Sequence, residues 1–243
     1  MLRLDVNRRA RAVLMGAGLV LALASCGSDK SETELAKATA GFLKDAGQKI
    51  GSKIKPGKAK KTAGPAAAAD PNVIVAKALA ATKGPIAIVV RVETNSVLAM
   101  NPVGRNGNHV TWGSATGQGI TYNRGVLTNT RGLGEDLMSS SIDSAVSAIT
   151  ARRNASYTRD HYYLGDLGQN TRLTVNCTLA RTKSERVAVG DINADAAVMK
   201  ESCSNGAISF TNLYWVDGRG NVLKSSQWVG QRIGSLAIQN LRL

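Results

Sequence analysis

Residues 207–228 read AISFTNLYWVDGRGNVLKSSQW and indicate the fold class more directly than any other part of the chain. Polar and apolar residues alternate in 207–216 and again in 222–228, as they do in a half-buried β-strand. The segment DGRGN at 217–221 consists of residues typical of tight turns. The stretch therefore predicts an antiparallel β-hairpin.

Strand-like segments of similar length recur upstream, each bounded by Gly, Asn or Asp. They cover 86–92, 96–101, 108–112, 119–122, 126–130, 157–164, 171–181 and 197–203. Apolar residues with helical spacing predict short helices at 72–83 and 144–152, the second with Asp143 as its N-cap. The pattern predicts a mostly β fold, an antiparallel β-sandwich or barrel-like domain with one or two short helices.

The N-terminus predicts export. Four arginines lie among the first residues: Arg3, Arg8, Arg9 and Arg11. The apolar run that follows, 12–24, has about 13 residues and is too short for a stable transmembrane helix, so it is typical of a secretory signal peptide. It ends in LASC at 23–26, which resembles a bacterial lipobox. The resemblance implies that residues 1–25 are removed and that Cys26 carries acyl chains, which anchor a protein stably when there are two or more.

Residues 26–72 predict a lipidated, flexible tether before a β-rich domain at 73–243. Residues 27–72 contain nine lysines and five acidic residues, are rich in Ala and Gly, and have Phe42 as their single aromatic residue. Such a segment has too little apolar surface to offset the entropy of ordering, so a disordered tether is expected. A basic amphipathic helix at 34–54, lying on an anionic membrane or wall polymer, is the less favoured alternative.

The net charge of +14, from 31 basic and 17 acidic residues, first suggests nucleic acid or an anionic surface as a partner. The signal peptide and the tether hold half of that excess, because 73–243 contain 18 basic and 11 acidic residues. Export excludes nucleic acid as the physiological partner. The remaining charge favours anionic components of the cell envelope.

Cys177 and Cys203 remain once Cys26 carries lipid, and an isolated pair in an oxidising compartment predicts a disulfide. No Gly-x-Ser-x-Gly motif surrounds any serine, so a triad of His161 with Asp160 or Asp166 is not favoured. A calcium loop built on residues 191–195 is disfavoured too, because the glycine and the distal glutamate of such a loop are absent. We therefore predict no catalytic residue, no metal and no cofactor.

Two segments carry a family resemblance, TNTRGLGEDLMS at 128–139 and NLYWVD at 212–217, the latter continuing through QWVG at 227–230 to Gly234. With the lipobox and Val110-Thr111-Trp112, they resemble the YjbF/GfcB family, the group 4 capsule polysaccharide lipoproteins, over 89–241. The resemblance implies a mostly β outer-membrane lipoprotein that works with machinery for making or exporting capsule or exopolysaccharide, and it implies no catalytic residues. The long Lys/Ala-rich tether is a departure from the family pattern.

Both segments suggest a binding surface in which aromatic rings stack on sugar rings or receive a partner protein. Its candidate residues are Arg131, Gly132, Gly134, Asp136, Tyr214, Trp215, Arg219 and Trp228. In the hairpin, Tyr214 and Val216 are expected on one face and Trp215 on the other, with Trp215 and Trp228 meeting across the strands. The favoured alternative is that the tryptophans fill the core.

The sequence thus predicts a lipid-anchored outer-membrane accessory protein that faces the periplasm and acts in capsule or exopolysaccharide production or export without catalysis. Its expected partners are membrane lipid, through the acyl chains, and polysaccharide-export proteins or acidic exopolysaccharide. One alternative is an envelope scaffold whose basic tether binds anionic wall or lipid. A periplasmic polysaccharide-modifying enzyme is the least favoured reading.

Overall fold

The computed structural model describes residues 71–164 and 168–243. The predicted signal peptide, Cys26 and nearly all of the predicted tether lie outside these residues, and so does Asp166. The boundaries expected at 25/26 and 72/73 therefore stay predictions. None of the helices in the described part of the chain combines the length and apolar character needed to cross a membrane.

The described residues form one twelve-stranded sheet with two short helices. The strands are β1 (Ile86–Arg91), β2 (Ser96–Asn106), β3 (His109–Ser114), β4 (Gly119–Asn123), β5 (Val126–Arg131), β6 (Leu137–Ser140), β7 (Ala155–Leu164), β8 (Asn170–Val189), β9 (Ile192–Ser204), β10 (Ser209–Val216), β11 (Val222–Gly230) and β12 (Gly234–Arg242). The helices are α2 (Pro71–Ala81) and α3 (Asp143–Thr150). The prediction of a mostly β fold with short helices is confirmed.

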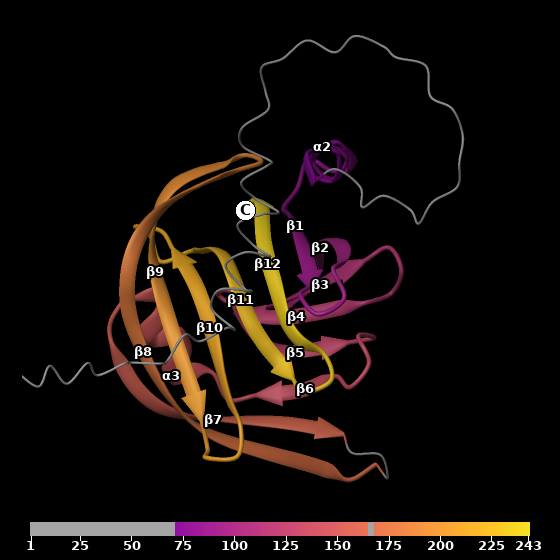
Figure 1. Cartoon of the computed structure of the whole chain (residues 1–243). Coiled ribbons are helices and arrows are strands. Elements are labelled where there is room, and N and C mark those ends of the chain that lie inside the picture. The colour runs from indigo at the N-terminus through magenta and orange to yellow at the C-terminus, as the bar shows by residue number, and fades with distance from the viewer. Residues whose placement is uncertain (1–70, 165–167) are drawn as a thin grey trace, which may run out of the picture.

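The sheet is antiparallel and curls into a nearly closed barrel (Figure 1). Its strand order is β5-β4-β3-β2-β1-β12-β11-β10-β9-β8-β7-β6, so β5 and β6 are the two edges. These edges lie against each other, and the Asn129 side chain on β5 donates a hydrogen bond to the Met138 carbonyl on β6 at 3.0 Å. Of the two predicted architectures, the barrel-like one is therefore correct.

Three details differ from the sequence prediction. Strands β6 and β12 were not expected, and β8 and β9 are longer than the segments predicted for them. Helix α3 has Ile142 as its N-cap, with no side-chain capping bond, and Asp143 is its first helical residue. The predicted cap at Asp143 is wrong because the helix begins one residue earlier than the capping rule suggests.

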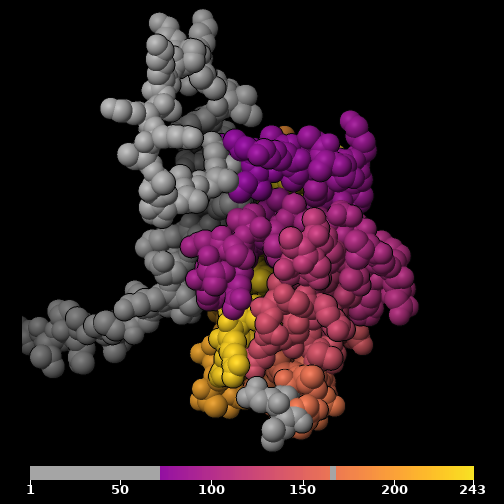
Figure 2. Space-filling view, turned by 90° about the vertical axis from the view of Figure 1, so that its right-hand side faces the viewer, coloured from indigo at the N-terminus to yellow at the C-terminus, as the bar shows by residue number. Residues whose placement is uncertain are grey.

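Apolar residues fill the barrel and also cover parts of its outside. One interior cluster includes Trp112, Tyr122 and Val229, and a second packs the buried face of α3 against Tyr214. Outside the barrel, α2 packs Ala78 over β1 and β12. Figure 2 shows α2 at the top of the face made by β2 to β5, and the described ends of β7 and β8 near the bottom. The barrel therefore has one end near α2 and another remote from it.

Candidate functional site

The predicted surface at 131–136 forms the turn that joins the two edge strands. The Asp136 carboxylate accepts hydrogen bonds from the Gly132 N–H at 2.7 Å, the Leu133 N–H at 3.0 Å and the Thr130 hydroxyl at 3.0 Å. Gly134 has a φ of 122°, a conformation that side-chain-bearing residues rarely adopt. Asp136 and the glycines therefore hold the turn together, and Arg131, the last residue of β5, is exposed.

The hairpin aromatics point away from solvent. Tyr214 is fully buried in the interior, and Trp215 is buried against the outer face of the sheet, with the Lys224 ammonium 3.9 Å from its ring centroid. The two residues thus lie on opposite faces, as predicted, but neither contributes an exposed ring. For Trp215, the alternative that the tryptophans are buried in an apolar core is therefore correct.

Trp215 and Trp228 do not meet across the hairpin, which corrects the expectation from their spacing. Trp215 pairs with Lys224, whereas Trp228 lies beyond the paired part of the hairpin and pairs with Ser235 on β12. The Asn212 side-chain oxygen accepts a hydrogen bond from the backbone N–H of Trp228 at 2.7 Å. Trp228 therefore has no paired residue on β10, and part of its surface stays exposed.

A buried ion pair lies inside the barrel between β7 and β9. The Arg159 guanidinium is 3.0 Å from the Glu201 carboxylate, and both side chains are buried. Glu201 also accepts hydrogen bonds from Asn212 at 2.6 Å, Tyr157 at 2.7 Å and Tyr214 at 3.1 Å. Burial alone would raise the pKa of Glu201, but Arg159 and these donors hold it below its usual value. The ion pair and its donors fix the relative positions of β7, β9 and β10.

His161 lies next to this ion pair, in a box of aromatic rings. Phe210 and Trp228 stack with centroids 4.2 Å apart, and His161 meets both rings edge-on at 5.9 Å and 6.1 Å. The His161 ring is 1% exposed, and neither of its nitrogens has a hydrogen-bond partner within 71–164 and 168–243. Burial and the nearby Arg159 charge lower its pKa to about 3, so the imidazole is neutral at neutral pH.

The other titratable groups weighed for catalysis or metal binding have different partners. Asp160 forms an ion pair with Arg172 at 2.7 Å, away from the box that holds His161. On the β8–β9 hairpin, Arg186 contacts both Asn193 and Asp195, and Asp191 pairs with Arg242. Cys177 and Cys203 form the predicted disulfide between β8 and β9.

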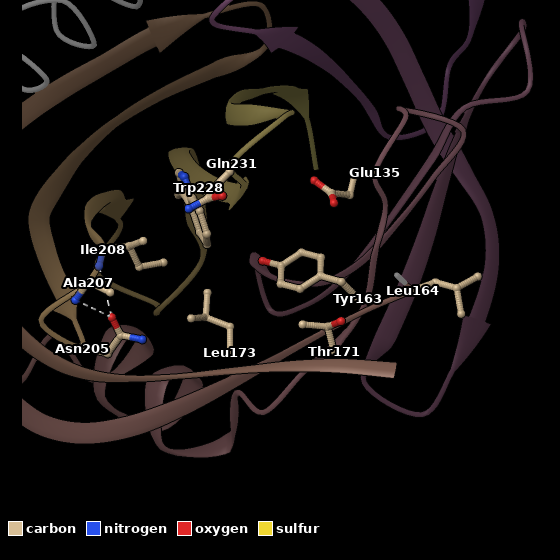
Figure 3. Close-up of a pocket in the computed structure, with 10 residues that line it drawn as sticks. All are labelled: Glu135, Tyr163, Leu164, Thr171, Leu173, Asn205, Ala207, Ile208, Trp228 and Gln231. Carbon is tan, nitrogen blue, oxygen red and sulfur yellow. Dashed lines mark hydrogen bonds between the residues drawn. The ribbon is translucent and has the colours of Figure 1, made fainter. Parts of the chain in front are cut away.

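A pocket of about 250 Å³ opens where β7 and β11 end; we call it the Trp228 pocket. Figure 3 shows Trp228, Tyr163 and Leu173 around it, with Glu135 and Gln231 at its edge. Its lining also includes Asn205, Thr171 and Ile208. The Tyr163 hydroxyl donates to the Val229 carbonyl at 2.6 Å, which fixes the ring that forms one wall. The pocket combines an aromatic face with amide, hydroxyl and carboxylate groups.

The predicted surface residues fall in separate places. Trp228 is the one aromatic residue among them that lines the pocket, and Glu135, next to Asp136, lines it too. Arg219 is in the β10–β11 turn, at the other end of β11 from Trp228. Sequence reasoning missed Tyr163, Asn205 and Gln231, because they come from strand ends and turns that only the folded barrel brings together.

The fold and this pocket define a class: a barrel-like antiparallel β-domain with a small, aromatic-walled site at one mouth. The chain belongs to the family described as group 4 capsule polysaccharide lipoprotein gfcB, YjbF, which matches residues 47–241. The match begins inside the predicted tether, so the expected departure from the family pattern does not extend over the whole tether.

A solved structure shares the fold. The hypothetical lipoprotein YmcC from Escherichia coli K12 superimposes with a TM-score of 0.61 at 17% sequence identity, over 71% of this chain and 90% of that chain. No curated protein matches the chain. The barrel is therefore a fold that this chain shares with another lipoprotein.

Proposed function

We propose that this chain is a lipid-anchored accessory protein of capsule or exopolysaccharide production or export, held at the outer membrane by acyl chains on Cys26 and facing the periplasm. It acts by binding a segment of the glycan, without chemical conversion. Membership of a capsule polysaccharide lipoprotein family supports the process, and the lipobox at 23–26 supports the anchor. The binding role depends on the Trp228 pocket.

The observation that carries the binding role is the chemistry of the Trp228 pocket. A pyranose ring has an apolar face that packs on an aromatic ring and a rim of hydroxyls that need donors and acceptors. Trp228 is stacked on Phe210, which holds its ring in place, and Gln231 and Glu135 offer planar polar groups at the edge. At about 250 Å³ the pocket is smaller than the roughly 300–1,000 Å³ of drug-sized sites. Its size therefore suits one sugar unit of a longer chain.

The test is a calorimetric titration of the full lipidated chain, in detergent, with oligosaccharides cut from the polysaccharide of the same cells. Replacing Trp228 by Ala should weaken binding by at least roughly 10-fold, because the stacking surface is lost. Tyr162→Ala is the matched control. Tyr162 is a half-buried aromatic residue on β7, next to Tyr163, and it does not line the pocket. Equal binding by the Trp228→Ala variant and the original chain would contradict the proposal.

A further inference from the structure

A second pocket, of about 230 Å³, lies at the opposite end of the barrel; we call it the Trp112 pocket. The β4–β5 turn at Arg124 and the β10–β11 turn at Asn221 form two of its sides. Strand β11 begins at this pocket with Val222 and reaches the Trp228 pocket near its other end. The two pockets are therefore separate sites, at the two mouths of one barrel.

The Trp112 pocket has an exposed rim and a buried floor. Arg105 and Arg124 are exposed on the rim, whereas Trp112, Tyr122 and Asn240 are buried below them. The Trp112 and Tyr122 rings stack with centroids 5.5 Å apart. The floor belongs to the rigid interior core, so the pocket is a formed cup and not a gap between mobile side chains.

Two polar atoms of the floor residues have no partner among the described residues. The Trp112 indole N–H is buried and donates no hydrogen bond within 71–164 and 168–243. Asn240 donates from its amide nitrogen to the Val222 carbonyl at 2.9 Å, which leaves its side-chain oxygen without a donor in the same part of the chain. Both atoms are sealed from solvent beneath the cup, so the floor is polar as well as aromatic there.

The rim is cationic. Across the residues that the structure describes, neither Arg105 nor Arg124 has an ion pair or a side-chain hydrogen bond, and no Asp or Glu side chain lines the pocket. Leu243, the last residue of the sequence, also lines the pocket, and its main-chain carboxylate forms no ion pair with either arginine. The Arg124 guanidinium is close to Gly220 in the facing turn, and both residues line the pocket. A guanidinium pairs with a carboxylate through two parallel hydrogen bonds. The Trp228 pocket differs, because Glu135 is its one charged lining residue.

We infer that the Trp112 pocket binds a carboxylate-bearing sugar unit, such as a uronate residue of an acidic glycan. The carboxylate lies between Arg105 and Arg124, and the sugar ring lies over the aromatic floor that Trp112 and Tyr122 form. The inference goes beyond the proposed function, because it adds a second site with its own ligand class. The Trp228 pocket can fail its test while this site stands, and the reverse also holds.

The experiment compares two ligands on the full lipidated chain in detergent. One is a trisaccharide of uronate units, and the other is the same trisaccharide with its carboxylates reduced to alcohols. At low salt we expect the acidic trisaccharide to bind at least roughly 10-fold more tightly than the reduced one. The reason is that a carboxylate forms two charge-assisted hydrogen bonds with an arginine, whereas an alcohol does not. The variant Arg105→Gln with Arg124→Gln should lose that preference, and Trp228→Ala should keep it.

Two controls make the result specific to this pocket. Arg153→Gln with Arg181→Gln removes the same charge from exposed arginines outside both pockets and should keep the full preference. The second control is Trp228→Ala, which should keep the preference because Trp228 does not line this pocket. Equal affinity for the two ligands, an unchanged preference in the Arg105/Arg124 variant, or equal displacement by inorganic sulfate at the same concentration would overturn the inference.

Discussion

Asp136 shows how a single carboxylate closes the barrel. Both of its oxygens accept hydrogen bonds from the turn it belongs to, and Thr130 passes the connection on by accepting from the Leu137 N–H at 3.0 Å. The segment predicted as part of a binding surface therefore stabilises the turn between β5 and β6. Its neighbour Glu135 is one of the residues that line the Trp228 pocket.

His161 gives the clearest prediction for a single residue. Its pKa falls from 6.5 to about 3 on folding, so between these values the unfolded chain binds a proton that the folded chain does not. Stability should therefore fall as pH is lowered through this window, by about 1.4 kcal/mol for each unit of pKa difference at most. The His161→Phe variant should lose this part of the pH dependence, measured by urea unfolding from pH 7 to pH 4.

The exposed His109 supplies the control for that measurement. His109→Phe should retain the decline seen in the original chain. Carboxylates whose pKa is lowered in the folded chain, such as Glu201, cause a further loss of stability as the pH falls further. A His161→Phe curve that runs parallel to the original curve between pH 6.5 and pH 4 would show that His161 titrates normally in the folded state.

At the scale of elements, the disulfide joins the two longest strands. Cys177 on β8 lies directly opposite Cys203 on β9, and the two are 26 residues apart in the chain. A cross-link of this loop length should stabilise the fold by about 3 kcal/mol in the chain-entropy treatment. The double variant Cys177→Ala with Cys203→Ala should lose that amount in urea unfolding. The original chain should lose it on reduction, and the variant should not respond to reductant.

The strands also show what a sequence can and cannot predict. The alternating segments between Gly-rich turns were found because period-two patterning is local. Strand β12 was missed because Gln239 and Asn240 are buried there as polar residues, which breaks the apolar alternation. Strand β6 has only four residues, too few to carry a pattern.

The candidate site was predictable only in part, because most of its residues are brought together by the fold and not by local sequence. Trp228 could be named because an aromatic residue near a hairpin is conspicuous in the sequence. Its neighbours Tyr163, Asn205 and Gln231 come from three distant turns and strand ends. The buried Arg159–Glu201 pair escaped notice because each residue sits alone in an otherwise strand-like segment, and only the barrel brings them together.

At the scale of the whole molecule, the barrel is a rigid body with two different mouths. Helix α2, where the described chain begins, packs on β1 and β12. Strand β12 contributes Asn240 to the Trp112 pocket, and Pro85, just before β1, also lines it. The Trp228 pocket is at the remote end. If residues 26–72 are the tether that the sequence predicts, the Trp112 pocket lies near the start of the domain and the Trp228 pocket faces away from it.

Binding of the glycan at the Trp228 pocket can be measured directly, because the chain has three tryptophans. Each indole N–H gives its own signal in a proton–nitrogen NMR spectrum of the labelled protein. On titration with fragments of the cells' own polysaccharide, we predict a shift of the Trp228 signal at saturating ligand. The Trp215 signal, from a buried ring outside both pockets, should stay in place. A Trp228 signal that does not move would contradict glycan binding at the Trp228 pocket.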